Sequence, residues 1–125
     1  MDPWFTLQWS LDSTHLFYVK VEEEAAAFAA RSLFRHKIGT KVDEDVLLFN
    51  ETDASFVVML SRSNDHLYLF ITTSSSASSE VWYLESSRPL DAVRCVQPRK
   101  RNVMYWVEHH DRYSFGSSLR DLYKK

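Results

Sequence analysis

A phrase that occurs twice constrains this chain more than any other feature. "WSLDSTHLFYV" begins at Trp9, and "SRSNDHLYLF" begins at Ser61, so that a shift of 51 residues aligns Ser10 and His15 with Ser61 and His66. Two later pairs also correspond, "LFRHKIGT" with "VWYLESSR" and "DEDVLLF" with "LDAVRCV", at spacings of 48 and 47 residues. A period of this length indicates repeated supersecondary units, which must be recognised before single elements are assigned.

Short segments rich in β-branched, aromatic and aliphatic residues fill both repeats, and such segments between turns are typical of strands. They are 16–21, 32–37, 45–50, 55–61, 66–73, 80–85, 92–97 and 103–109. A four-stranded unit that recurs every 47 to 51 residues predicts a blade of a β-propeller. We expect an all-β fold of about two and a half four-stranded antiparallel blades within 1–125, with units at about 9–54 and 55–102 and a third beginning at 103.

The connections depend on Asp, Asn and Ser, because the chain has only two glycines. The serine-rich run 72–80 has strand-like flanks, which favours a hairpin turn over a flexible linker. One stretch, "EEEAAAFAARS", departs from the strand pattern. Its leading acidic residues and trailing arginine suit a helix dipole, so we expect a short helix near 22–31.

The composition fits one domain and argues against several classes of partner. A chain of 125 residues that is 45% hydrophobic has enough material for a core. The net charge of −2 gives no general attraction to nucleic acid or to an anionic membrane, and no apolar run approaches the length of a membrane span. The basic run "PRKR" at 98–101 is interpreted as a solvated turn. The only cysteine, Cys95, can form no disulfide within the chain, which suits a reducing compartment such as the cytoplasm.

The residues that could form a metal site have a structural alternative that we favour. His109, His110 and Asp111 follow Glu108, but neighbours on a strand point to opposite faces. At most two of the four could meet one ion, and two ligands make a weak site. The favoured interpretation is a strand that ends in a polar turn.

The other conspicuous side chains are also assigned to structure. His15 and His66 occupy equivalent turn positions in the repeat, which favours a structural role for both. Cys95 lies in a predicted strand and is expected to be a buried small side chain. Large aromatic rings bury the most area in a thin sheet. The tryptophans assigned to packing within or between blades are Trp4, Trp9, Trp82 and Trp106.

The ordered motifs "RHKIGTKVDEDVLLFNETDASFVVMLSRSNDHLYLF", "TTSSSASSEVWYLES" and "YWVEHH" resemble the propeller domain of the prolyl oligopeptidase family, and most closely oligopeptidase B. The resemblance covers roughly residues 9–113 and ends before "SFGSSLRDLYKK". It implies a segment of a seven-bladed propeller that covers an α/β-hydrolase domain with a Ser-Asp-His triad. It also implies short peptides cut after Lys or Arg, with the propeller limiting entry to small substrates.

These residues contain no nucleophile elbow, which requires a Gly-x-Ser-x-Gly-like turn after a strand. The only serine beside a glycine lies in "FGSSL", with one glycine and no apolar strand before it. We therefore expect no α/β-hydrolase domain, no catalytic residues, no cofactor and no metal. Two hypotheses remain: a partial propeller that gates and scaffolds an oligopeptidase B-like serine peptidase, or a stand-alone interaction module derived from a propeller.

A partial propeller also predicts which partners the chain meets. The outward faces of its first and last units should expose apolar side chains, which favours association. The residues expected there are Phe17, Val57, Leu69 and Trp106. The expected partners are short peptides through the whole enzyme, a second copy of the chain, or a complementary propeller or hydrolase segment.

Overall fold

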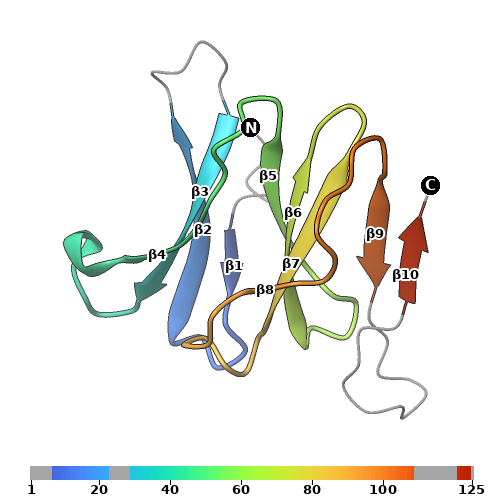
Figure 1. The fold of residues 1–125 in the computed structure, drawn as a ribbon. Coiled ribbons are helices and arrows are strands. Elements are labelled where there is room, and N and C mark those ends of the chain that lie inside the picture. Colours follow the sequence, from blue (N-terminus) through green and yellow to red (C-terminus); the bar gives the residue numbers. More distant parts are fainter. Residues whose placement is uncertain (1–6, 23–28, 109–120, 125) are drawn as a thin grey trace.

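Three antiparallel sheets follow one another along the chain, from blue to red in Figure 1. The computed structural model describes residues 7–22, 29–108 and 121–124. The first sheet has the order β1 (Leu7–Trp9), β2 (His15–Glu22), β3 (Ala29–Lys37) and β4 (Val46–Asn50), with a 3₁₀ turn at Val42–Glu44. The second has the order β5 (Val57–Arg62), β6 (Tyr68–Ser74), β7 (Ser79–Glu85) and β8 (Arg94–Cys95). The third pairs β9 (Tyr105–Glu108) with β10 (Asp121–Lys124).

The all-β fold class predicted from the repeat is confirmed by these antiparallel meanders. The pairing of 16–21 with 32–37 places Phe17 opposite Arg35, and the pairing of 66–73 with 80–85 places Phe70 opposite Tyr83. The serine-rich run closes the β6–β7 hairpin, as expected. Strands β1 and β10 were not predicted, because each is short and lies outside the segments that the repeat aligned.

The short helix expected near 22–31 is wrong at both of its ends. Glu22 belongs to β2 and lies opposite Ala29 of β3, and Val21 lies opposite Ala30. The part of that prediction at 23–28 lies outside the described residues. A bulge after Lys20 lets the two strands continue, and their ladder satisfies backbone groups that a marginal one- or two-turn helix would leave open.

The main apolar core lies between the first and second sheets. Its buried members are Phe17, Val19, Leu33, Val58, Leu60, Leu69, Ile71 and Leu84. The expectation that Phe17 and Leu69 are exposed is therefore wrong, since each side chain is only 1% exposed. Val57 at 44% and Trp106 at 49% are exposed, as expected. The neighbouring sheet decides the difference, because it covers one face of each hairpin.

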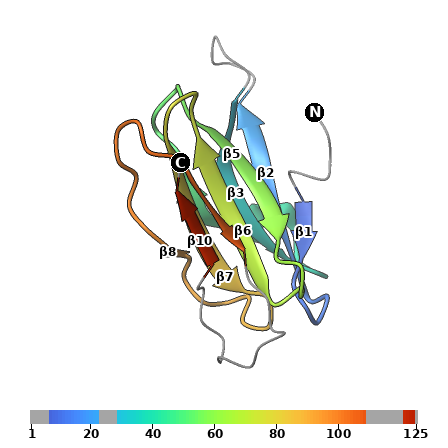
Figure 2. The ribbon, with the colours of Figure 1, turned by 90° about the vertical axis from the view of Figure 1, so that its right-hand side faces the viewer.

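A second core lies between the second and third sheets, so the second sheet is buried on both faces. It joins Tyr68, Phe70 and Val81 to Tyr105 and Val107. The Tyr105 hydroxyl accepts a hydrogen bond from the Val81 backbone N–H at 2.8 Å, which ties the third sheet to β7. Figure 2, turned by 90°, shows the strands lying over one another as layers.

A side-chain-bonded turn recurs in the β1–β2 and β5–β6 hairpins. Ser10 Oγ donates to Asp12 Oδ1 at 2.8 Å and accepts from the His15 N–H at 3.1 Å. The second copy of the turn runs from Ser63 through Asp65 to Tyr68, with distances of 2.6 and 3.0 Å. Short side chains that bond nearby backbone groups hold such turns without glycine.

This geometry corrects the alignment of the repeat. Ser10 corresponds to Ser63, and His15 corresponds to Tyr68, so the shift in the first hairpin is 53 residues rather than 51. His15 and His66 are therefore not equivalent. His15 begins β2 and is buried, whereas His66 lies within the turn at φ = 65°, the place that Ser13 takes at φ = 61°.

The first of these turns yields a prediction about acid stability. Hydrogen bonds from Thr14 and Ser10 lower the pKa of Asp12 from 3.8 to about 2, so the folded state favours the carboxylate. A depressed pKa contributes stability above the unfolded pKa and loses it as the pH falls through the folded value. We expect Asp12→Asn to lower the free energy of unfolding at neutral pH, with a difference that shrinks between about pH 4 and pH 2.

Urea unfolding of both proteins across this pH range measures the difference. Asp43→Asn, which changes an exposed carboxylate in the 3₁₀ turn at Val42–Glu44, is the matched control. A difference that is constant with pH would contradict the role given to Asp12.

Candidate functional site

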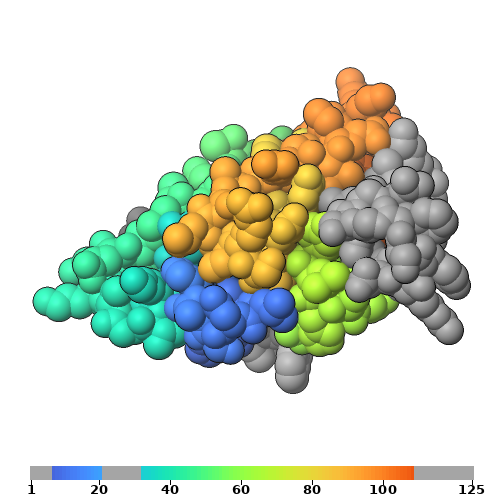
Figure 3. All heavy atoms as spheres, turned by 90° about the horizontal axis from the view of Figure 1, so that it is seen from below, coloured from blue at the N-terminus to red at the C-terminus, as the bar shows by residue number. Residues whose placement is uncertain are grey.

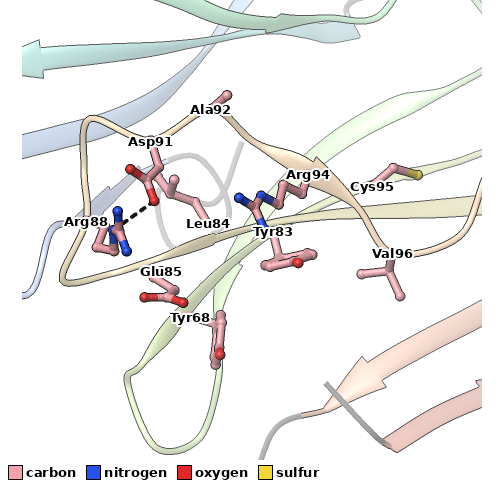
Figure 4. Close-up of a pocket in the computed structure, with 10 residues that line it drawn as sticks. All are labelled: Tyr68, Tyr83, Leu84, Glu85, Arg88, Asp91, Ala92, Arg94, Cys95 and Val96. Carbon is pink, nitrogen blue, oxygen red and sulfur yellow. Dashed lines mark ion pairs between the residues drawn. The ribbon is translucent and has the colours of Figure 1, made fainter. Parts of the chain in front are cut away.

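A cavity of about 500 Å³ lies beside the β7–β8 loop. Figure 4 shows its lining, which includes two tyrosine rings from β6 and β7 and charged side chains from the loop and β8. The lining residues used below are Tyr68, Tyr83, Glu85, Arg88, Asp91 and Arg94. Tyr68 and Tyr83 meet edge to face with ring centroids 5.9 Å apart, which fixes the floor of the cavity.

The polar groups around this cavity include one exposed ion pair and one thiol. Arg88 pairs with Asp91 at 3.0 Å, but both side chains are largely exposed, so the pair contributes little stability. Cys95 is the only thiol in the lining. Burial, together with the nearby Glu80 carboxylate, raises the pKa of Cys95, so the thiol is held in its weakly nucleophilic protonated form. The lining contains neither serine nor histidine, so it offers no hydroxyl nucleophile of serine and no imidazole base.

The equivalent position on the first sheet is covered by the β7–β8 loop of the second sheet. Phe17 lies opposite Arg35 in the first sheet, and Phe70 lies opposite Tyr83 in the second, so Arg35 and Tyr83 hold equivalent places. Arg35 Nη1 donates to the Pro89 carbonyl at 3.2 Å, in the β7–β8 loop of the next sheet. Leu11 N–H also donates to the Ser86 carbonyl at 2.9 Å. Figure 3 shows the β7–β8 segment, in gold and orange, against the blue β1–β2 turn.

Arg99 forms the densest polar cluster, between the first and second sheets. Its Nη2 donates to Glu51 Oε1, to Thr73 Oγ1 at 3.0 Å and to Glu80 Oε1 at 3.3 Å. The guanidinium carbon also lies 3.8 Å from the centre of the Phe56 ring, a cation–π contact. One cation thus joins the end of β4, the start of β5 and the β6–β7 hairpin.

The interpretation of "PRKR" as a solvated turn is therefore wrong for Arg99. Its side chain is 27% exposed, and those of Glu51 and Glu80 are 6% and 11% exposed. Burial would lower the pKa of Arg99, but the two carboxylates outweigh it and raise that pKa above its ordinary value. No local signal marks Arg99, since its partners lie 48 and 19 residues away in sequence. Pro98, Lys100 and Arg101 are exposed.

A third polar cluster lies on the face of the first sheet that points away from the second. Asp45 accepts a hydrogen bond from the Tyr18 hydroxyl at 2.5 Å and one from His36 Nδ1 at 2.6 Å. The Asp45 side chain is only 4% exposed. The hydrogen bond from Tyr18, and after it the hydrogen bond from His36, lowers the pKa of Asp45. Burial and the Asp45 carboxylate raise the pKa of Tyr18 to about 12. His36 and Asp45 belong to the motifs that carried the family resemblance.

Most of the other residues considered from sequence lie outside the part of the chain that the structure describes. Glu108 accepts a hydrogen bond from Asn64 Nδ2 at 3.1 Å, while His109, His110 and Asp111 lie outside the described residues. Within the described ranges, no three His, Cys, Asp or Glu side chains gather as a metal site would require. The serines of "FGSSL" also fall outside those ranges. A bilayer-spanning helix is likewise not found in the described part of the chain.

The tryptophans divide between packing and exposure. Trp82 packs between the sheets, with its ring centroid 5.4 Å from that of Phe49. Trp9 and Trp106 lie on strands and are exposed, and Trp4 lies outside the described residues. Inter-blade packing therefore holds for Trp82.

The comparisons with known proteins agree with this architecture. The model of the family described as prolyl oligopeptidase, N-terminal β-propeller domain, matches residues 2–121. The match extends past Tyr113, so the expectation that "SFGSSLRDLYKK" leaves the family pattern there is wrong. The chain is 30% identical over 104 residues to protease 2 of Moraxella lacunata, covering 83% of this chain and 15% of that protein.

Two solved structures share both fold and sequence. Oligopeptidase B from Trypanosoma brucei, in a closed form with covalently bound antipain, matches with a TM-score of 0.76 and 30% identity over 85% of this chain and 15% of that one. Oligopeptidase B from Leishmania major matches with a TM-score of 0.74 and 31% identity over 83% of this chain and 14% of that one. The chain spans about 15% of the length of these relatives.

The Arg99 cluster predicts a large and specific loss of stability. Removing a guanidinium that two buried carboxylates share leaves both charges uncompensated, which typically costs about 3–5 kcal/mol. We expect Arg99→Ala to lower the free energy of unfolding by about that amount in urea titrations at pH 7. Arg101→Ala, two residues away and exposed, should change it by less than about 0.5 kcal/mol. Equal effects of the two substitutions would refute the assignment.

Proposed function

Because the chain belongs to the prolyl oligopeptidase family, as part of its N-terminal β-propeller domain, we propose that it gates and scaffolds an oligopeptidase B-like serine peptidase. Its own role is non-catalytic. The observation that carries the proposal is the repeated interface, in which each sheet packs a face on the next through an apolar cluster. A surface built in this way forms the wall of a larger ring.

The cavity beside the β7–β8 loop supports the same proposal. The cavity lies at the position of the second sheet that is equivalent to the position of Arg35 on the first sheet. On the first sheet this position is covered by the second sheet, through the contact of Phe49 with Trp82 and the hydrogen bond from Arg35 to the Pro89 carbonyl. β9 and β10 reach only part of that face, and Figure 4 shows them to one side of the cavity. We assign the cavity to the third and fourth strands of the third sheet rather than to a small molecule.

The activity of the whole protein follows as part of this proposal. A hydrolase domain under the ring would cleave short peptides after Lys or Arg, and the ring would keep larger substrates from the catalytic triad. We place the protein in the cytoplasm, because its one cysteine needs no oxidising compartment.

The first prediction from this proposal concerns the isolated chain. We expect the purified 125 residues to show no turnover of Lys- or Arg-linked chromogenic substrates, because no Gly-x-Ser-x-Gly-like elbow occurs in the sequence and no serine or histidine lines the cavity. Turnover that disappears when one serine of the chain is covalently labelled would contradict the proposal.

A chimaera tests the gating role directly. The segment of Trypanosoma brucei oligopeptidase B that matches this chain is replaced by residues 1–125, with the rest of the enzyme unchanged. We expect the chimaera to cleave a short basic peptide. It should leave uncut a folded protein that contains the same cleavage site. The control is a second chimaera carrying Leu60→Asp, which places a charge in the core between the first two sheets.

The control should lose stability and size selection. If the first chimaera digests the folded protein as readily as the short peptide, the gating role is excluded.

The exposed sheet faces predict how the isolated chain behaves. Leu7, Trp9 and Leu47 are 42%, 44% and 53% exposed on one face of the first sheet, and a contiguous apolar surface favours association. We expect sedimentation at tens of micromolar to show concentration-dependent association with binding of a hydrophobic dye. A monodisperse monomer that binds no dye would favour the stand-alone interaction module instead.

A further inference from the structure

A second pocket, of about 310 Å³, lies between the first and second sheets, beside β1 and the end of β5. Its lining comes from Gln8 on β1 and from residues 60–64 and 66 around the β5–β6 turn. β1 contacts β5, and Figure 3 shows the blue β1–β2 turn beside the green β5–β6 turn. Among the described residues, this lining includes an arginine, a histidine, two side-chain amides and two serines, but no Asp or Glu. We call it the Arg62 pocket.

The strand register directs Arg62 toward the first sheet. Arg62 and Leu60 lie on the same face of β5, because side chains alternate along a strand, and Leu60 belongs to the core between the first two sheets. Gln8 lies opposite Phe17 of the same core, so Gln8 faces the second sheet. The guanidinium and the amide therefore enter the pocket from opposite sheets.

Arg62 differs from two other arginines that lie between these sheets. Arg99 is shared by two carboxylates, and Arg35 donates to the Pro89 carbonyl. Arg62 is exposed, and within the described ranges it forms no ion pair. Its charge is therefore available to a ligand.

Two acidic side chains close to this pocket in sequence or through a bond have partners of their own. Asp65 accepts a hydrogen bond from Ser63 Oγ at 2.6 Å, within the turn. Glu108 accepts one from Asn64 Nδ2 at 3.1 Å, which also engages one of the two amides. Gln8 and Arg62 are thus the donors left to face a ligand.

The turn itself does not require these polar side chains. At the shift of 53 residues that relates the two hairpins, Trp9 takes the place of Arg62 and Ser13 takes the place of His66. The first hairpin forms the same side-chain-bonded turn without a cation or an imidazole at these places. Folding of the hairpin therefore leaves both groups unexplained.

Resting on the proposed function, we infer that the Arg62 pocket binds the free C-terminal carboxylate of an extended peptide in the channel of the ring. A guanidinium can bind a carboxylate through two parallel hydrogen bonds, and the Gln8 amide can add a third donor. β1 and β5 begin their units and contact each other. Blades converge toward the axis of a propeller, so these two strands border its central channel.

The free edge of β5 favours a peptide over a lone anion. Among the described strands β5 pairs only with β6, so its other edge keeps a row of backbone N–H and C=O groups open. An extended peptide can pair with such an edge while its last residue places the carboxylate against Arg62. A phosphate ion would use the guanidinium and leave the edge unpaired.

Equilibrium dialysis of radiolabelled acetyl-triglycine against the 125-residue chain tests this inference, because dialysis tolerates self-association. The only charge of this peptide is its carboxylate. We expect saturable binding that unlabelled acetyl-triglycine displaces and acetyl-triglycine amide does not. Acetyl-trisarcosine keeps the carboxylate but lacks backbone N–H groups, so it should compete at least about threefold less well.

Substitutions locate the site. Arg62→Gln should weaken the binding of acetyl-triglycine at least about tenfold, because a charge-assisted pair of hydrogen bonds is lost. Arg62→Lys, which keeps the charge without the planar fork, should weaken it less. Arg101→Gln changes an exposed arginine outside the pocket and is the matched control, with no expected effect. Circular dichroism verifies that each variant keeps the β fold.

The outcomes separate the inference from the proposed function. Binding that the amide displaces equally well, or that persists in Arg62→Gln, overturns the inference. Inorganic phosphate that displaces the label while acetyl-trisarcosine competes as well as acetyl-triglycine would show a small-anion site without edge pairing, and would also overturn it. A size-selecting chimaera whose inserted segment binds no acetyl-triglycine overturns the inference alone. Specific binding in a chimaera that digests folded proteins excludes the gating role and supports the carboxylate site.

Discussion

Burial of the second sheet on both faces is the constraint on which the rest of this structure depends. Along β6, Leu69 and Ile71 pack toward the first sheet, while Tyr68 and Phe70 pack toward the third. Such a sheet cannot keep its apolar side chains from water alone, so its stability comes largely from its neighbours, as in other repeat proteins. The alternation of strand side chains thereby turns a four-stranded unit into a layer that needs another layer on each side.

Polar contacts fix how these layers sit on one another, because apolar packing is not directional. The Arg99 cluster ties the end of the first sheet to the β6–β7 hairpin, and the Arg35–Pro89 bond ties β3 to the β7–β8 loop. On the face of the first sheet that points away from the second, the buried Asp45 carboxylate accepts hydrogen bonds from Tyr18 and His36.

The cavity beside the β7–β8 loop has charged and aromatic lining but no activated nucleophile, and its thiol is held protonated. Its lining comes from β6, β7, β8 and the segments that adjoin β8. The similarity to oligopeptidase B at 30% identity and a TM-score of 0.76 places the same layers in the propeller of a peptidase.

The sequence by itself determined the local structure: strands, antiparallel pairing, side-chain-bonded turns and the four-stranded period, since these depend on neighbours in the chain. The quoted motifs contain His36 and Asp45, but nothing in the sequence singled out either residue or showed that they meet. Only the tertiary structure decided that Phe17 and Leu69 lie on sheet faces that a neighbouring sheet covers. It also decided that the shift between the equivalent hairpins is 53 residues, and that β2 and β3 extend where a helix was expected. It alone placed Arg99 between Glu51 and Glu80, which are distant in sequence. The physical reason is that alternation places a side chain on one of two faces, whereas the sheet that packs there decides whether it is buried.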